Sequence, residues 1–182
     1  GTQHSACETE YNIERVLPLA ARVSAGGSGG ANGKAAPLLF RADSGFDSAK
    51  LMCAIDSQAQ QLKRAVAFII KWNPRNTPVE TIAKARVADA GTAWAILREG
   101  KRACLWSESV ELKHAQHQMA VRRIYRLTER TIDKRGQQML LPEYVLEGWS
   151  TTLPQTDASG AQELIDLYAD YGPHEQFNSE LK

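Results

Sequence analysis

Hydrophobic residues near the start of the chain follow a helical spacing. They recur three or four positions apart, and the pattern predicts an amphipathic helix over residues 11–23. Pro18 lies inside this segment, and a proline weakens the helix that follows it because it lacks a backbone N–H. The apolar positions that define this helix are Ile13, Val16, Leu17 and Ala20.

Two continuous apolar runs follow, and each leads into a segment with helical spacing. Residues 37–42 form a short, mainly apolar run that predicts a buried strand. Residues 65–71 are apolar up to Lys71, which is typical of a strand buried on both faces. Residues 48–62 have helical periodicity between them. A second helix is expected to run to about Ala88, with Thr77 as its N-cap. This strand–helix–strand–helix order predicts a parallel α/β layer.

The pattern changes to strand-like runs between residues 92 and 153. Apolar and polar residues alternate there, and residues 99–101 and 133–136 have the composition of turns between paired strands. We therefore expect about 60 residues of antiparallel sheet inserted into the α/β frame. Helical spacing returns after Ser159. The Gly- and Ser-rich stretch at residues 24–34 is interpreted as a long loop within one domain.

Composition narrows the class of protein without identifying it. The chain has 182 residues, of which 43% are apolar, so it is long enough for one ordinary core. No apolar run approaches the length of a membrane span, and no membrane partner is expected. The formal net charge is +1. Ten Lys and Arg face five Asp and Glu between residues 98 and 135, and the basic segment is followed by an acidic one. This asymmetry favours a surface for a polyanion.

Cysteine and histidine positions argue against disulfide and zinc sites. Cys7, Cys53 and Cys104 are far apart, and an odd number of isolated cysteines is typical of reduced thiols in a cytosolic protein. His114 and His117 are close in sequence but have no third ligand at a suitable spacing. We expect both to be ordinary surface histidines.

Two acidic residues are candidates for chemistry. Asp43 comes directly after the first buried strand, and Glu175 lies in the terminal helical segment. In a continuous helix Tyr168, Glu175 and Lys182 would share one face, because they are spaced by heptads. A carboxylate and a lysine on one face suit the binding of a metal ion and a phosphate.

These residues resemble a known family. R-A-D-S-G-F at residues 41–46 resembles the motif at the second catalytic aspartate of DDE insertion-sequence transposases. Tyr168, Glu175 and Lys182 resemble the Tyr-Arg-Glu-Lys signature of the same group, at the same spacing. G-T-Q-H-S at residues 1–5 and F-I-I-K-W-N-P-R at residues 68–75 are also similar to core segments of that family. The similarity extends over essentially the whole chain.

The resemblance implies a fold and a domain order. It implies an α/β, RNase H-like core with an inserted antiparallel β-rich subdomain. The core would occupy residues 1–90, and the β-rich insertion would occupy residues 91–155. Residues 156–182 would form a helical segment that returns the catalytic Glu to the core. Position 171 is Tyr where the family has Arg, Gly172 and Pro173 interrupt the helix, and residues 1–42 contain no aspartate for the first position of the triad. We therefore expect a truncated, internal piece of a transposase.

The resemblance also implies an activity and its residues. The parent activity is metal-dependent nicking of transposon ends followed by strand transfer, with Mg²⁺ as the metal and Mn²⁺ as a substitute. Asp43 and Glu175 would be both catalytic residues and metal ligands. With two of the three carboxylates, little cleavage is expected from this chain alone. The residues implied to contact DNA are Tyr168, Lys182, Arg122, Arg123, Arg126 and Trp149, the last by stacking on a base.

Partners and alternatives follow from the same resemblance. The expected partners are DNA, as transposon ends and target, and further copies of the full-length transposase. The expected location is the bacterial cytoplasm, in association with the nucleoid. Two alternatives remain open at this stage: a DNA-binding or interaction remnant without catalysis, and a nuclease or resolvase of the same fold. Each candidate residue also has a structural interpretation, as a cap, a solvated charge or a packed aromatic.

Overall fold

The chain forms two compact units with a mixed α/β composition. A computed structural model describes residues 9–26, 36–154 and 160–170. Unit 1 comprises Gly1–Asn73, Ser109–Arg123 and Ser150–Pro154, and unit 2 comprises Pro74–Glu108, Ile124–Trp149 and Gln155–Lys182. The described residues contain four α-helices and a six-stranded sheet with the order β1-β2-β6-β5-β4-β3. The expected α/β class with antiparallel strands following a parallel pair is therefore confirmed at this level.

Three long strands belong to both units. They are β4 (Lys101–His114), β5 (His117–Ile132) and β6 (Gln138–Thr151). Each strand has one part in unit 1 and one part in unit 2. The two units are therefore interleaved along the sequence, and boundaries at residues 90 and 155 stay a prediction.

The first helix, α1 (Thr9–Gly26), is longer than the sequence pattern indicates. It continues through Pro18 and extends into the segment expected to be a loop. An internal proline costs about 3 kcal/mol in a helix. Burial of Ile13, Leu17 and Ala21 along one face offsets that cost.

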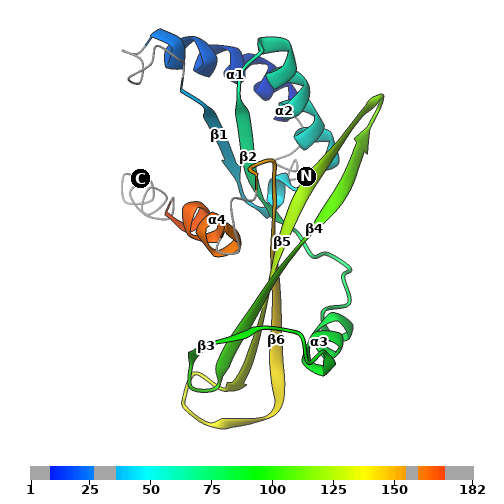
Figure 1. Ribbon diagram of the computed structural model, residues 1–182, viewed down its shortest axis with the longest axis vertical. Helices are drawn as coiled ribbons and strands as arrows, with labels where there is room; N and C mark the ends of the chain where they lie inside the picture. Colours follow the sequence, from blue (N-terminus) through cyan, green and yellow to red (C-terminus); the bar gives the residue numbers. More distant parts are fainter. Residues whose placement is uncertain (1–8, 27–35, 155–159, 171–182) are drawn as a thin grey trace, which may run out of the picture. The chain divides into compact units, whose positions relative to one another are not determined.

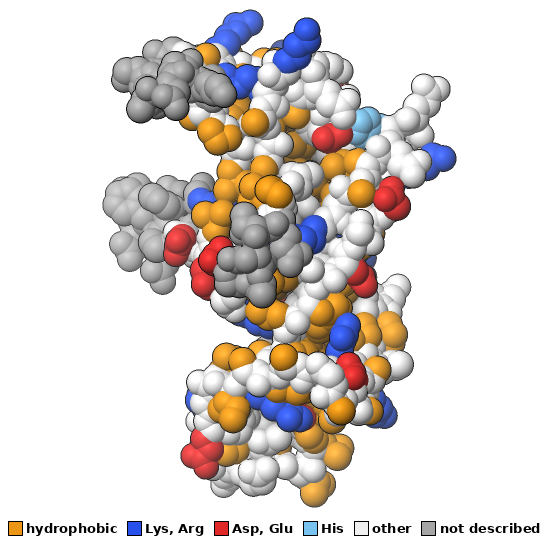
Figure 2. Space-filling view, in the orientation of Figure 1, with side chains coloured by type: hydrophobic (Ala, Val, Ile, Leu, Met, Phe, Trp, Pro, Cys, Tyr) orange, Lys and Arg blue, Asp and Glu red, His pale blue; other side chains and the backbone are white. Residues whose placement is uncertain are grey.

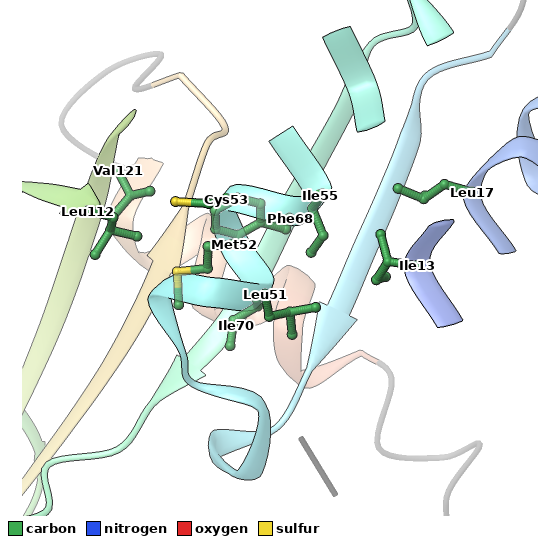
Figure 3. Close-up of a cluster of buried hydrophobic side chains, with 10 residues drawn as sticks. All are labelled: Ile13, Leu17, Leu51, Met52, Cys53, Ile55, Phe68, Ile70, Leu112 and Val121. Carbon is green, nitrogen blue, oxygen red and sulfur yellow. The ribbon is translucent and has the colours of Figure 1, made fainter. Parts of the chain in front are cut away.

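Unit 1 is built on two parallel strands covered by helices (Figure 1). β1 (Leu38–Ala42) pairs with β2 (Val66–Trp72), with Ala42 opposite Ile70. Helix α2 (Ala49–Leu62) connects them and begins at Ser48, whose side chain accepts a hydrogen bond from the Leu51 N–H. Figure 3 shows side chains of α1, α2 and β2 pointing into one apolar core, to which β4 and β5 add Leu112 and Val121.

The end of β6 joins this layer through buried hydroxyl groups. Thr151 is fully buried and donates to the Phe68 carbonyl at 2.7 Å. The neighbouring Thr152 hydroxyl accepts from the Phe68 N–H at 3.2 Å. These bonds pair the polar end of β6 with the middle of β2, so neither backbone group of Phe68 is left unsatisfied.

The turn between β4 and β5 contacts helix α2. It is a two-residue turn in which Ala115 adopts a positive φ of 53°. The His117 Nε2 lies 2.8 Å from the Asp56 Oδ2 on α2, which fixes this hairpin to the helical layer of unit 1. His117 is thus held in a contact with α2 instead of standing free at the surface.

Unit 2 contains α3 (Val79–Ala88), β3 (Trp94–Arg98) and α4 (Gly160–Ala169). The expected N-cap of α3 is wrong by one residue: Pro78 holds that position, with no side-chain capping bond. The turns expected at residues 99–101 and 133–136 are present, and Gly100 (64°) and Gly136 (83°) adopt a positive φ in them. Among the described residues, no helix combines the length and hydropathy that spanning a membrane requires.

Candidate active site at the carboxyl end of β1

Asp43 lies at the first position after β1, where the chain turns towards α2. It is the N-cap of a short 3₁₀ turn (Ser44–Phe46), and its Oδ1 accepts a hydrogen bond from the Gly45 N–H at 2.9 Å. The side chain is exposed. Its second oxygen, Oδ2, has no hydrogen-bond or ionic partner among the described residues. Asp43 therefore combines a structural role with one free anionic ligand atom.

The carboxyl end of β2 lies beside that of β1, because the two strands are parallel. The Asp47 Oδ2 accepts from the Asn73 N–H at 3.0 Å, which connects the segment after Asp43 to the end of β2. In open α/β sheets, ligands bind outside the carboxyl ends of the strands. This edge of unit 1 is consequently the natural place for a site that includes Asp43.

A cation is held near the end of β2. The Arg123 guanidinium lies over the Trp72 ring at 5.5 Å, and its Nε donates to the Ser150 hydroxyl at 3.1 Å. Both contacts orient the guanidinium without neutralising it, since neither partner carries a charge. Arg123 therefore keeps a full positive charge in unit 1, the unit that also contains Asp43.

The described residues supply only part of a metal site. Mg²⁺ prefers oxygen ligands and keeps several of its waters, so a few carboxylates are enough to bind it. Asp43 offers one such oxygen. No group of three or more His, Cys, Asp or Glu side chains suited to a metal occurs within residues 9–26, 36–154 and 160–170. Glu175, the other predicted ligand, lies outside the described residues, as does Lys182.

Tyr168 lies in the last turn of α4, which ends at Ala169. Its ring meets the Trp149 ring edge to face, with 6.3 Å between the centroids. The heptad face that would join Tyr168 to Glu175 therefore extends beyond the described part of the chain. Within unit 2, Tyr168 packs against an aromatic residue of β6.

Trp149 is a packing residue and does not form the exposed platform expected for base stacking. Its side chain is only 2% exposed. Besides Tyr168, it contacts the Arg126 guanidinium, which lies 5.3 Å from its ring centroid. A DNA base cannot stack on a ring that is buried to this extent. The expectation that Trp149 stacks on a base is therefore not supported by the structure.

The arginines of β5 have different surroundings from one another. Arg126 pairs with Glu147, with Nη2 2.5 Å from Oε2, and Arg130 pairs with Glu143 at 3.1 Å. The Nε of Arg122 has no hydrogen-bond partner in the described part of the chain, and burial lowers the pKa of this arginine. Of the three β5 arginines expected to contact DNA, Arg126 is therefore already paired with a carboxylate across the hairpin.

These contacts share a geometric rule that the sequence reasoning missed. Three ionic or polar contacts of β5 with β6 have the same midpoint, between Gly136 and Gln137 of the turn: Arg126–Glu147, Arg130–Glu143 and Glu129–Tyr144. Side chains that face one another across an antiparallel hairpin behave in this way. The turn recognised at residues 133–136 is centred between Lys134 and Arg135, so its position alone does not predict these partners.

Comparison with known proteins adds no assignment. No family model matches the chain, and a search of curated proteins finds no match either.

Proposed function

We propose that this chain carries part of the catalytic domain of a DDE-class DNA transposase with an RNase H-like core. The observation that supports this most directly is the placement of Asp43, immediately after a strand of a parallel pair, with one carboxylate oxygen free among the described residues. The long antiparallel strands between Asp43 and Glu175 agree with a β-rich insertion. The parent reaction is the nicking of transposon ends and their transfer to a target.

The proposed chemistry rests on two carboxylates. Asp43 and Glu175 would hold divalent cations, Mg²⁺ or Mn²⁺, through their oxygens. When bound, such ions activate an attacking water or 3′-OH and stabilise the leaving oxygen of a phosphodiester. The hydrogen bond from Gly45 fixes the direction of the Asp43 carboxylate and leaves Oδ2 for the ion.

The proposed contacts with DNA use cations of the chain. Arg123 lies near the end of β2 and has no ionic partner among the described residues, so it suits a phosphate oxygen. Arg122 stays part of the proposal, but its Nε is buried and does not support it. Lys182 and Tyr168 retain this role as part of the proposal. Arg126 is a weaker candidate, because Glu147 already neutralises it.

Little cleavage is expected from this chain by itself. Residues 1–42 contain no aspartate, so two carboxylates of a three-carboxylate set are present. Fewer anionic ligands lower the affinity for a divalent cation. A direct test therefore has to detect weak metal binding and should not depend on turnover.

Paramagnetic broadening by Mn²⁺ provides such a test. In a ¹⁵N-labelled sample of the whole chain, we expect Mn²⁺ to broaden the amide signals of residues 43–45 and of Glu175 at the same concentrations. Asp43→Asn should remove both effects, because Asn keeps the N-cap hydrogen bond but carries no charge. Glu175→Gln should weaken both.

The outcome separates shared from independent binding. Broadening near Asp43 that leaves the Glu175 signal unchanged would show that the two carboxylates do not share an ion. Such a result would contradict the proposal. An unchanged titration in Asp43→Asn would contradict it as well.

DNA binding without catalysis is the second candidate. The observation in its favour is that Asp43 already has a structural task as the cap of the 3₁₀ turn. This alternative predicts that the double variant Asp43→Asn, Glu175→Gln shifts DNA in a gel as well as the parent chain does. It also predicts that Mn²⁺ broadens neither carboxylate region.

A further inference from the structure

A hollow in unit 2 is lined by basic side chains of the β3–β4 hairpin. Its volume is about 500 Å³. Three cations line it, Arg98, Lys101 and Arg102, together with two carboxylates, Glu99 and Glu129. Figure 2 shows basic side chains beside hydrophobic ones in the lower part of the view, where Figure 1 draws β3 and the β5–β6 turn. The balance of charges in this hollow depends on which of the groups are already paired.

Glu129 is committed to other residues of unit 2. It is 7% exposed, it forms an ion pair with Arg102, and its second oxygen accepts a hydrogen bond from the Tyr144 hydroxyl at 3.0 Å. Arg102 also lies over the Trp94 ring at 4.4 Å. Glu129 and Trp94 therefore orient the Arg102 guanidinium, whose terminal nitrogens have no hydrogen-bond partner among the described residues.

Arg98 and Lys101 face each other directly across the hairpin register. Like charges in opposed positions of an antiparallel pair destabilise the pair. Neither residue has an ionic partner within the described part of the chain. The hairpin thus holds two cations without an ionic partner, and the turn residue Glu99, beside the oriented Arg102. Three cations and two carboxylates leave the hollow with a net charge of +1, which favours a bound anion.

The neighbouring turn extends the positive surface. The Gly100 carbonyl accepts a hydrogen bond from the Thr131 N–H at 2.8 Å, which places the β3–β4 turn beside the end of β5. Lys134 and Arg135 are exposed in the turn that follows. The Asp133 carboxylate accepts from two backbone N–H groups of that same turn, which holds one negative charge beside these two cations.

We propose that this hollow binds phosphate groups of a DNA strand, with Arg98, Lys101 and Arg102 as donors. Arginine forks match pairs of phosphate oxygens, and the adjacent turn offers further cations for the next phosphates along a strand. Ile96, opposite Arg102 in the register and 83% exposed, gives the hollow an apolar rim for the sugars. The choice of DNA over another source of phosphate rests on the proposed function. The assignment of the hollow as an anion site does not rest on it.

Salt dependence of DNA binding is the appropriate test. The parent chain and the double variant Arg98→Gln, Lys101→Gln would be titrated against a fluorescent DNA duplex at several salt concentrations. EDTA would be present throughout, so that metal-dependent chemistry plays no part. Each lost phosphate contact should reduce the slope of log affinity against log salt by about one. We expect a reduction of about two, and an affinity loss of roughly 10- to 60-fold at 0.1 M salt.

A matched variant controls for net charge. Arg22→Gln with Lys84→Gln removes the same charge from exposed positions of α1 and α3. We expect its slope to stay close to that of the parent chain. Equal losses in the two double variants would overturn the proposal, as would a parent chain that does not bind the duplex.

The melting temperature of the Arg98→Gln, Lys101→Gln variant distinguishes ligand binding from a purely structural role of the two residues. Because Arg98 and Lys101 repel each other, the hollow variant should melt at the same temperature as the parent chain or slightly higher. A lower melting temperature, matched in size to the loss of affinity, would overturn the proposal.

The last measurement compares the binding of the parent chain and of the Arg98→Gln, Lys101→Gln variant to vesicles of phosphatidylserine and phosphatidylcholine. A lipid headgroup also presents phosphate, so this arm distinguishes the two sources. Vesicle binding that falls in the hollow variant while duplex binding persists would assign the hollow to a lipid surface and overturn the DNA proposal.

Discussion

Arg126 reaches across the β5–β6 hairpin to Glu147, with Nη2 2.5 Å and Nε 3.1 Å from the same carboxylate oxygen. The guanidinium also covers the Trp149 ring. One arginine therefore joins an ion pair to the packing of an aromatic side chain. Its charge is therefore already engaged, which makes Arg126 a weak candidate for a contact with DNA.

Replacing Glu147 should be more costly than replacing Glu143. Glu147 is 23% exposed and Glu143 is 49% exposed, and the energy of an ion pair falls as solvent screens it. We expect Glu147→Gln to lower the free energy of unfolding by about 1–2 kcal/mol. Glu143→Gln should cost less than about 0.5 kcal/mol. Urea denaturation of both variants provides the comparison, and equal losses would contradict the role given to burial.

Tyr144 should make stability fall at alkaline pH. Burial raises the pKa of Tyr144, and the hydrogen bond to Glu129 and the charge of that carboxylate raise it further. The folded state then holds the phenolic proton more tightly than the unfolded state does. The resulting stability is fully present below about pH 10 and is lost as the pH rises through the folded pKa.

Tyr144→Phe isolates this contribution. Burial also raises the pKa of the Cys53 and Cys104 thiols, which gives the same sign of pH dependence in the parent chain and in the variant. The difference between the two unfolding curves, measured from pH 8 to 11, should therefore report Tyr144 alone. We expect the variant to be about 1 kcal/mol less stable at neutral pH and to lose less stability above pH 10. Parallel curves would show that Tyr144 does not titrate as inferred.

The two turn glycines should respond differently to alanine. A Cβ on Gly100 would lie 2.4 Å from the Cγ1 of Ile132, whereas a Cβ on Gly136 would meet nothing within 4 Å. Both residues have positive φ, so alanine is strained at each by about 1–2 kcal/mol. Gly100→Ala adds a steric clash, and we expect a total loss of about 3 kcal/mol or more. Thermal melting that ranks Gly136→Ala as the more damaging change would refute this account of the β3–β4 turn.

Trp149 should affect stability without a specific effect on DNA. Trp149→Phe removes part of a buried ring system, and we expect a loss of about 1–3 kcal/mol in unfolding free energy. Measured well below the melting transition, its affinity for a DNA duplex should stay within about twofold of the parent value. A large loss of affinity at unchanged stability would restore the base-stacking hypothesis.

Elements with simple periodicity were predictable from the sequence, and their contacts were not. The parallel pair, α2 and the glycine turns follow from apolar runs and turn residues, and they occur where expected. Helix α1 continues through Pro18 because tertiary burial outweighs a local preference. The β4–β5 turn was missed because Ala115 has no turn signature, although it adopts a positive φ.

The candidate site was predictable in part. The position of Asp43 after a strand came directly from the apolar run before it, and the structure agrees. Arg126 and Trp149 were assigned to DNA because residue type alone does not indicate which neighbours a side chain meets. Their partners depend on the register of the β5–β6 hairpin and on the packing of α4, and the expected turn at residues 133–136 does not fix either.

The sharing of β4, β5 and β6 between the two units has a practical consequence for dissecting the protein. A contiguous segment that contains all of unit 1 must run to Pro154, and by then it already includes most of unit 2. Truncation series would damage both units at once, and their results would mislead. Point substitutions and segmental isotope labelling are the tools that fit such an interleaved architecture.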